Sequence, residues 1–315
     1  MNEGTTLVTG AAGFVGQHLL RRLRRQRVVG WYHPDTAPPA AGPHLTWRAV
    51  DLLDRDGVEA ALELDAPDEI YHLAGASQVD TSWTSVVPHL RTNALGTYYL
   101  LESAHRINLG CRIMVVTSAQ IYQSSDDPID EDAPMVPPTP YGLSKLAQDQ
   151  LALRAAHEDG LDVVLARPFN HTGPGQQPSY AVPSFARQIA RIEAGLIAPT
   201  MTVGNLDSRR DITDVRDVVE AYYLMMQGAP PGRPYNVCSG RAWRIGDLLD
   251  ELLQLTDVDV EVAVDESRRR PMDVPVMQGD ATRIRSELGW SPHISVEETL
   301  RDTLDWWRRQ TVSEL

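Results

Sequence analysis

Short apolar runs alternate with longer amphipathic stretches along the first half of the chain. Residues 5–9 form a β-branched run that ends at a glycine, which predicts a buried strand. In residues 14–25 the apolar positions recur at helical spacing, and four arginines gather at the end, as is typical of a helix C-terminus. The chain is therefore predicted to begin with a strand, a glycine turn and a helix.

The same alternation continues to about residue 166. It predicts further strands near 27–29, 46–50, 69–73, 112–117 and 162–166. It predicts helices near 56–64, 85–106 and 141–157. Strands and helices that alternate in this way form a parallel sheet with helices on both faces, so we expect an α/β fold with a Rossmann-type doubly wound sheet.

Beyond about residue 170 the alternation stops, and turns rich in proline and glycine separate shorter elements. This change predicts a smaller C-terminal α/β lobe. We expect residues 1–170 to form the larger domain, with returning segments at about 211–242. The smaller lobe is expected to take residues 171–210 and 243–315, and residues 301–309 have the pattern of an amphipathic packing helix.

Composition and charge exclude several classes of protein. The 315 residues are 42% hydrophobic and 23% charged, as in ordinary globular proteins. The net charge of -14 repels polyanions, so we expect neither a nucleic acid nor a membrane as partner. Two cysteines are too few for a disulfide framework or a zinc cluster, and no apolar run reaches the roughly 18 residues of a membrane span. We expect a cytoplasmic protein without a metal site.

A glycine turn joins the first strand to the first helix. It has the spacing Gly-x-x-Gly-x-x-Gly over residues 10–16. Backbone N–H groups at such a turn, together with the positive end of the helix, suit the pyrophosphate of a dinucleotide, although the turn alone could be purely structural.

The next strand ends at Tyr32 and His33 without the acid that would hold the ribose of NAD. This absence, with Arg25 or Arg27 as candidate partners of a 2′-phosphate, favours NADP(H) slightly over NAD(H). Asp51, after the third strand, fits either an adenine contact or an ordinary loop aspartate.

Lysine is almost absent from the chain, since 28 of its 29 basic residues are arginine and Lys145 is the exception. Thr139 and Pro140 predict a helix start that puts Tyr141 one turn before Lys145. An ammonium near the phenol would lower the pKa of the tyrosine and allow proton exchange with a substrate oxygen. Ser118, at the end of the fifth strand, is placed to bind the same oxygen. A surface pair and a strand-end hydroxyl are the structural alternatives.

Together these motifs resemble one family. With the glycine turn, His72-Leu73-Ala74-Gly75, Asn93 and Arg167-Pro168-Phe169-Asn170, the chain resembles the extended short-chain dehydrogenases/reductases that act on nucleotide sugars. The resemblance implies that Ser118, Tyr141 and Lys145 are catalytic, that Asn93 supports the lysine, and that the larger domain binds the dinucleotide. The cofactor contacts it implies are Gly10, Ala12, Gly13, Phe14, Val15, Gly16, Asp51, Leu52, Leu73, Ala74, Gly75, Asn93, Tyr141, Lys145 and Pro168.

The second half of the chain is most similar to GDP-4-keto-6-deoxy-D-mannose reductases. The similar stretches are residues 167–176, 210–217, 235–240 and 270–275. This resemblance implies that the smaller lobe binds the nucleotide sugar, that GDP is its nucleotide, and that the helices near 85–106 and 141–157 form a homodimer. The substrate contacts it implies are Ser77, Gln120, Asn170, Val182, Arg187, Arg210 and Arg270. A guanidinium suits phosphate oxygens, although for any one arginine a surface ion pair is the alternative.

The chain departs from related dehydratases at one informative place. They carry an acid pair after the catalytic hydroxyl position, whereas this chain has Ala119 and Gln120. Loss of water needs an acid and a base there, so 4,6-dehydration is disfavoured. Our leading hypothesis is an NAD(P)H-dependent reductase of a C4 ketone, with a C4 epimerase that keeps NAD bound as the alternative. A non-catalytic nicotinamide sensor would not need Ser118, Tyr141 and Lys145 together.

Overall fold

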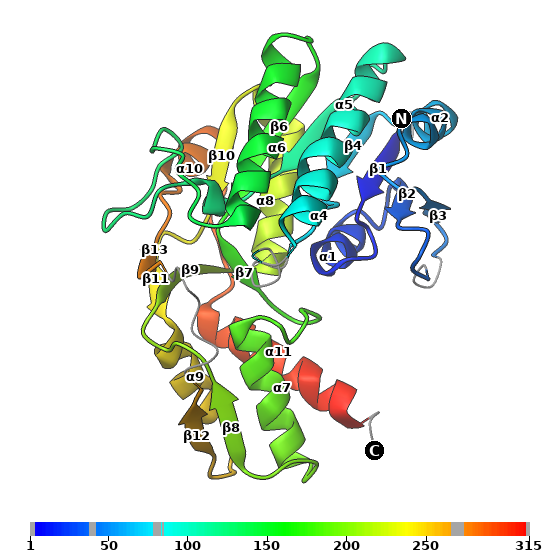
Figure 1. Cartoon of the computed structure of the whole chain (residues 1–315). Coiled ribbons are helices and arrows are strands. Elements are labelled where there is room, and N and C mark those ends of the chain that lie inside the picture. Colours follow the sequence, from blue (N-terminus) through cyan, green and yellow to red (C-terminus); the bar gives the residue numbers. More distant parts are fainter. Residues whose placement is uncertain (1–3, 38–41, 78–82, 84, 266–273, 313–315) are drawn as a thin grey trace.

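A seven-stranded parallel sheet is the centre of the computed structural model, which describes residues 4–37, 42–77, 83, 85–265 and 274–312. Its strand order is β10-β6-β5-β4-β1-β2-β3, which confirms the predicted doubly wound sheet (Figure 1). The strands are β1 (Thr5–Thr9), β2 (Arg27–Tyr32), β3 (Leu45–Ala49), β4 (Glu69–His72), β5 (Arg112–Val116), β6 (Asp162–Pro168) and β10 (Pro234–Val237).

Helices cover both faces of this sheet because consecutive residues of its strands, which point to opposite faces, are apolar. Leu7 packs into one hydrophobic core while its neighbour Val8 packs into another, and Ile113 and Met114 divide in the same way. The core around Val8 and Met114 includes α1 (Phe14–Arg22) and α8 (Val215–Gly228). The opposite core includes α2 (Arg55–Asp65), α5 (Gly96–Arg106) and α6 (Pro140–His157).

The predicted helix over 85–106 is interrupted. It consists of α4 (Val86–Leu90), one π-helical turn η1 (Arg91–Leu95) and α5. The π-helical turn contains Asn93, which is fully buried. The pattern of apolar residues did not show this break, because a π turn changes the helical period over only a few residues.

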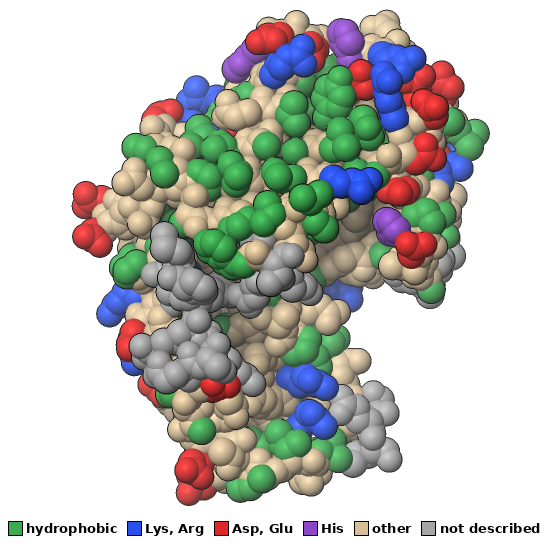
Figure 2. Space-filling model, in the orientation of Figure 1, with side chains coloured by type: hydrophobic (Ala, Val, Ile, Leu, Met, Phe, Trp, Pro, Cys, Tyr) green, Lys and Arg blue, Asp and Glu red, His purple; other side chains and the backbone are tan. Residues whose placement is uncertain are grey.

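A smaller lobe follows β6, as predicted, and its own core holds Phe185, Leu248 and Trp307. Its strands are β7 (Asn170–Thr172), β8 (Thr200–Val203), β9 (Arg209–Asp214), β11 (Ala242–Arg244), β12 (Glu261–Val264) and β13 (Val276–Met277). Its helices are α7 (Ala181–Glu193), α9 (Ile245–Leu253) and α11 (Val296–Val312), which includes the predicted packing helix. Figure 2 shows the molecule hollowed between the two lobes. The domain boundaries remain a prediction.

A buried ion pair fastens α6 to β6. The guanidinium of Arg167 donates two hydrogen bonds to Asp149, with Nε–Oδ1 at 2.9 Å and Nη2–Oδ2 at 2.7 Å. The hydroxyl of Thr117 also donates to Asp149 at 3.1 Å. Both charged side chains are at most 1% exposed, so each one neutralises the buried charge of the other.

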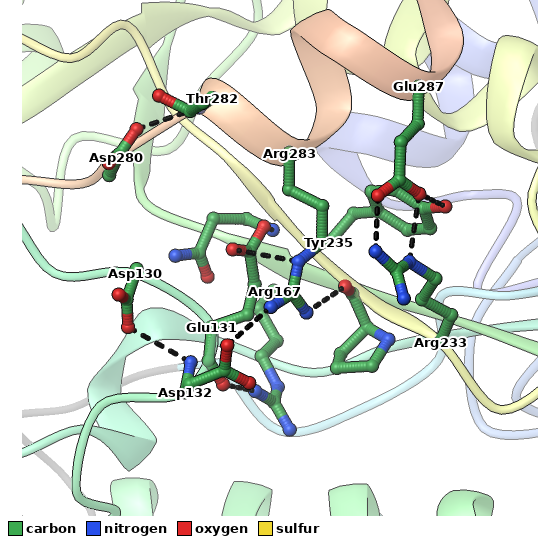
Figure 3. Close-up of polar contacts among 12 residues, drawn as sticks. Asp130, Glu131, Asp132, Arg167, Arg233, Tyr235, Asp280, Thr282, Arg283 and Glu287 are labelled. Atoms are coloured by element: carbon green, nitrogen blue, oxygen red, sulfur yellow. Dashed lines mark hydrogen bonds and ion pairs between the residues drawn. The ribbon is translucent and has the colours of Figure 1, made fainter.

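The same arginine joins a wider polar network (Figure 3). It donates to the Tyr122 hydroxyl at 2.9 Å and to the Glu131 carbonyl at 3.0 Å. The carboxylate of Glu131 accepts the backbone N–H of Asn236 in β10 and lies 3.4 Å from Arg283 of α10 (Thr282–Leu288). The network therefore ties β10, the edge strand of the large sheet, to the segment that follows Ser118.

We predict that Arg167→Met lowers the free energy of unfolding by roughly 3–5 kcal/mol, because it leaves the Asp149 carboxylate buried without its counter-charge. The double variant Arg167→Met/Asp149→Leu should recover part of this loss. Urea unfolding measures the free energy of unfolding of both variants. The matched control is Arg154→Met, which breaks the exposed Arg154–Glu158 pair and should change stability by less than about 1 kcal/mol. Equal losses for Arg167→Met and Arg154→Met would contradict the prediction.

Candidate active site

The turn between β1 and α1 has a backbone that suits an anion. The N-cap of α1 is Gly13, so no side chain caps the N–H groups of the first helical turn. Gly10 has φ +66°, and a Cβ atom at Gly16 would lie 2.4 Å from the Gly10 carbonyl oxygen. This bare helix N-terminus fits the diphosphate of a dinucleotide. On its outer side, the Phe14 ring stacks on His171 of β7, with the centroids 6.2 Å apart.

The carboxyl end of β2 lies beside a histidine between two acids. His33 follows Tyr32, the last residue of the strand, and its ring nitrogens lie 3.7 Å from Asp35 and 4.0 Å from Asp51. Asp51 also accepts the backbone N–H of Leu53 at 2.9 Å, as a loop aspartate does. Both roles considered for Asp51 therefore stay open.

Arg27 is the first residue of β2, at the opposite edge of the sheet from His33. Arg27 and Tyr32 are five positions apart in the extended strand, a distance of about 16 Å. Arg25 precedes the strand at the same far edge. The expectation that Arg25 or Arg27 could lie near a 2′-phosphate is therefore wrong, because strand direction places both at the wrong edge.

Ser118 and Tyr141 come together through a close helix approach. As predicted, Thr139 caps α6, its hydroxyl accepting the Gly142 N–H at 3.0 Å, and Pro140 is the first helical residue. A Cβ atom at Gly142 would lie 2.3 Å from the carbonyl oxygen of Gln120, so only glycine lets α6 pack this tightly against the turn after Ser118. Ser118 begins this turn, so it lies beside the first turn of α6, which carries Tyr141.

Burial decides the protonation of Tyr141 and Lys145 on α6. It raises the pKa of Tyr141, against a lowering by the hydrogen bond with Ser118, and Tyr180 raises it further. Burial also lowers the pKa of Lys145 to about 7. The expected lowering of the Tyr141 pKa is therefore wrong for the protein by itself, because the amine loses its charge at a lower pH than the phenol would ionise.

The family resemblance implied that Asn93 supports Lys145, but the Lys145 amine has other partners. It donates to the side-chain oxygen of Gln148 at 2.7 Å and to the Val116 carbonyl at 3.0 Å. Sequence reasoning did not identify Gln148, because a glutamine three residues after a lysine on a helix is common.

Asn93 instead anchors the loop after β4. Its amide holds both backbone polar groups of Ala76, at 2.8 and 3.1 Å, and donates to Ser144 at 2.8 Å. A Cβ atom at Gly75 would lie 2.7 Å from the Asn93 oxygen and 3.5 Å from the Lys145 nitrogen, so this glycine gives room for both side chains. The remaining predicted cofactor contacts Leu52, Leu73, Ala74 and Pro168 follow or end strands at the same edge of the sheet.

The predicted substrate residues are spread over both lobes. Arg187 places its guanidinium 5.6 Å from the Trp307 ring centre, whereas Val182 is buried in the core of the smaller lobe. Arg210 is buried in β9 and donates to the Arg209 carbonyl. Arg270 lies outside the described residues. Asn170 is exposed at the start of β7, and Gln120 is half-buried beside Ser118.

Tyr180 is a further residue that the sequence did not single out. Its hydroxyl donates to the carbonyl of Ser77, a predicted substrate contact, at 3.1 Å. Tyr180 also raises the pKa of Tyr141. The tyrosine belongs to a loop without regular periodicity, so no pattern could have placed it there.

Comparison with known proteins identifies the family of the chain. The family described as GDP-mannose 4,6 dehydratase matches residues 7–303, so the chain belongs to that family of nucleotide-sugar enzymes, the extended short-chain dehydrogenases/reductases. The chain is 34% identical to the GDP-6-deoxy-D-mannose reductase of Pseudomonas aeruginosa, over 98% of each protein.

Solved structures of relatives have the same fold. The structure of RMD from Pseudomonas aeruginosa complexed with NADPH has a TM-score of 0.85 and 33% identity, over 98% of this chain and 99% of that one. UDP-glucose 4-epimerase from Thermotoga maritima, solved with UDP-glucose, has a TM-score of 0.89 and 25% identity, over 98% and 99%.

We predict that Gly142→Ala reduces turnover more than tenfold, because the added methyl group forces α6 away from Gln120 and separates Tyr141 from Ser118. Stability should fall by about 1–3 kcal/mol. Steady-state kinetics and urea unfolding measure the two effects. The control is Gly110→Ala, where an added Cβ atom would meet nothing within 4 Å. Full activity of Gly142→Ala would show that this contact does not position the tyrosine.

Proposed function

We propose that this protein is a nicotinamide-dependent reductase of the C4 ketone of a 4-keto-6-deoxy nucleotide sugar. The substrate that the proposal favours is GDP-4-keto-6-deoxy-D-mannose, and the product is GDP-6-deoxy-D-mannose. The observation that carries the proposal is the placement of three residues: Ser118 follows β5, and α6 carries Tyr141 one turn before Lys145, whose amine donates to the Val116 carbonyl at the end of β5. The 34% identity to a GDP-6-deoxy-D-mannose reductase supports it.

Each catalytic side chain then has one role. The Ser118 hydroxyl hydrogen-bonds to the carbonyl oxygen of the substrate, and Tyr141 delivers a proton to that oxygen. The raised pKa of Tyr141 keeps the phenol protonated near neutral pH, as a proton donor must be. The Lys145 ammonium stabilises the charge left on the phenol. A reduced nicotinamide dinucleotide, with its diphosphate at the glycine turn, would supply the hydride.

The residues after Ser118 lack the acid and base that dehydration needs. Ala119 is buried and apolar, and Gln120 has a neutral side-chain amide, while its backbone N–H donates to the Ser118 hydroxyl at 3.2 Å. Neither side chain can remove a proton from a sugar carbon. We therefore place this chain with the reductases, although the family takes its description from a dehydratase.

A C4 epimerase is the second candidate, because the fold is also that of a UDP-glucose 4-epimerase, with a TM-score of 0.89. An epimerase needs an oxidised nicotinamide that stays bound between turnovers. Recovery of tightly bound NAD with the purified protein would favour this candidate, and consumption of added NADPH would favour the reductase.

The finer features of binding are also proposals. Arg187 and Arg210, in the smaller lobe, are suited to the diphosphate of the nucleotide sugar. We assign the dinucleotide to residues 1–170 with 211–242, and the nucleotide sugar to 171–210 and 243–315. Hydrogen exchange in the presence of each ligand tests this division.

The quaternary state and location follow from other features. Hydrophobic side chains gather on the face that α4 and α6 occupy in Figure 1 (Figure 2). Val87 of α4 and Leu143 of α6 are exposed hydrophobic residues, which supports a homodimer through these helices. The mass in solution tests the dimer. Free, buried Cys111 and Cys238 suit a reducing cytoplasm, which cell fractionation tests. Among the described residues, no helix has the length and apolarity to span a bilayer.

We predict that Tyr141→Phe lowers kcat by about 10²–10⁴-fold and leaves the Kd for NADPH within a few-fold of the wild type, because only the proton donor is lost. The loss of NADPH absorbance with GDP-4-keto-6-deoxy-D-mannose measures turnover. Tyr98→Phe, which removes a hydroxyl bonded to Glu102 on α5, is the control. Retention of more than a tenth of the turnover by Tyr141→Phe would end the assignment.

We propose NADP(H) as the preferred cofactor, because β2 ends at Tyr32 and His33 without a ribose-binding acid. His33→Asp should weaken NADPH about tenfold and change NADH little, because a carboxylate there repels a 2′-phosphate. Fluorescence titration with both cofactors measures this. His44→Asp, just before β3 at the opposite edge of the sheet, is the control. Equal weakening of NADPH and NADH by His33→Asp would contradict the proposal.

A further inference from the structure

A chain of buried hydrogen bonds leads from the Lys145 amine back to the first strand of the sheet. Lys145 donates to the oxygen of Gln148 at 2.7 Å, and the Gln148 nitrogen donates to the hydroxyl of Thr97 at 2.9 Å. His72 contacts the same hydroxyl through Nε2 at 2.8 Å. All four side chains are buried, and Gln148, Thr97 and His72 have no measurable exposure.

The direction of each hydrogen bond in this chain follows from the proton on Thr97. That hydroxyl has one proton, which it donates to the Asn93 carbonyl at 2.7 Å. Thr97 must therefore accept from Gln148 and from His72. The amide of Gln148 consequently has its nitrogen toward Thr97 and its oxygen toward Lys145, and the opposite orientation would place two donors against each other.

The tautomer of His72 follows from the same argument. Its Nε2 donates to Thr97, so Nδ1 accepts from the hydroxyl of Thr9 at 2.8 Å. Thr9 in turn accepts the backbone N–H of Ala74 at 3.1 Å. Burial lowers the pKa of His72 to about 3, which keeps the ring neutral and the pattern unchanged across the physiological range.

We propose that Gln148 is a positioning residue that holds the Lys145 amine and favours its charged form, and that Thr97 and His72 fix the orientation of its amide. The role in turnover rests on the proposed reductase function, since it acts through Lys145. The position itself rests only on the buried contacts of these side chains.

Few other charges face the amine. His72 is neutral, Tyr141 keeps its proton, and the Asp149 carboxylate is held by Arg167 and Thr117. The ammonium thus depends on two carbonyl dipoles, those of Gln148 and Val116, against the burial that lowers its pKa. Loss of one of two acceptors should therefore be easy to measure.

The composition of the chain allows a direct measurement. Lys145 is the only lysine, so protein labelled with [¹³C,¹⁵N]lysine gives the side-chain signals of this residue alone. Titration of its Cε resonance reports the pKa of Lys145 without any substrate, cofactor or activity. The wild type should titrate near pH 7.

Gln148→Leu should lower the midpoint by about one to two pH units, because the charged amine loses an acceptor. Gln148→Glu should raise it above the wild-type value, because a carboxylate replaces the amide. Gln150→Leu, on the exposed side of the same helix, is the matched control and should leave it unchanged. Midpoints for Gln148→Leu and Gln148→Glu equal to the wild type would overturn the proposal. If Gln148→Leu does not fold, Gln148→Glu decides alone.

A second pair of variants tests the orientation of the amide. Thr97→Val has nearly the same shape but no acceptor, and should lower the midpoint, whereas Thr97→Ser keeps the hydroxyl and should restore it. Equal midpoints for the two would contradict the part of the proposal that concerns Thr97.

Kinetics connect the position to turnover. The pH profile of kcat with NADPH and the keto sugar should move with the midpoint in Gln148→Leu and Gln148→Glu, while KM for the sugar stays within a few-fold. A midpoint that moves in a protein without reductase activity would retain the positioning role and reject the proposed function. If the protein is an active reductase but neither the midpoint nor the pH profile moves in these variants, the proposed function stands and the positioning role of Gln148 is rejected.

Discussion

The buried ion pair between Arg167 and Asp149 determines how the two halves of the proposed catalytic site meet. Asp149 lies one turn after Lys145 on α6, and it also accepts from Thr117, the residue before Ser118. One carboxylate therefore fixes the helix that carries the tyrosine and lysine against the strand end that carries the serine. Its charge is satisfied only while β6, α6 and the end of β5 keep this arrangement.

Tight packing at two glycines, together with the ion pair, fixes the position of α6 and of the loop after β4. Gly142 brings the first turn of α6 against Gln120, and Gly75 leaves room beside Asn93 and Lys145. At both places a methyl group would collide with atoms that are already hydrogen-bonded or in the main chain. The site is thus precise because small residues occur where the catalytic elements cross, in addition to the functional side chains themselves.

The sequence predicted the regular parts of the fold and the residues that form motifs. The sheet, the capped start of α6 and the juxtaposition of Ser118 with Tyr141 follow from periodicity and from motifs with strong local signals. The π turn at Asn93, the edge strand β10 and the role of Gln148 depend on which side chains meet across elements, which periodicity does not encode. The error about Tyr141 has the same origin, because the burial that raises the pKa of its phenol comes from the tertiary structure.

The identity of the group that faces Lys145 matters for the chemistry. A carboxylate at Gln148 would neutralise the ammonium and leave little of its field for Tyr141, whereas an apolar side chain would let burial discharge the amine. An amide avoids both outcomes, because it is a dipole that accepts one hydrogen bond and adds no net charge. The orientation of this amide must then be fixed by the group that faces its nitrogen, on the side away from Lys145. The proton that Thr97 gives to Asn93 and the neutral His72 do this, so the lysine depends on a hydrogen-bond chain that extends to β1.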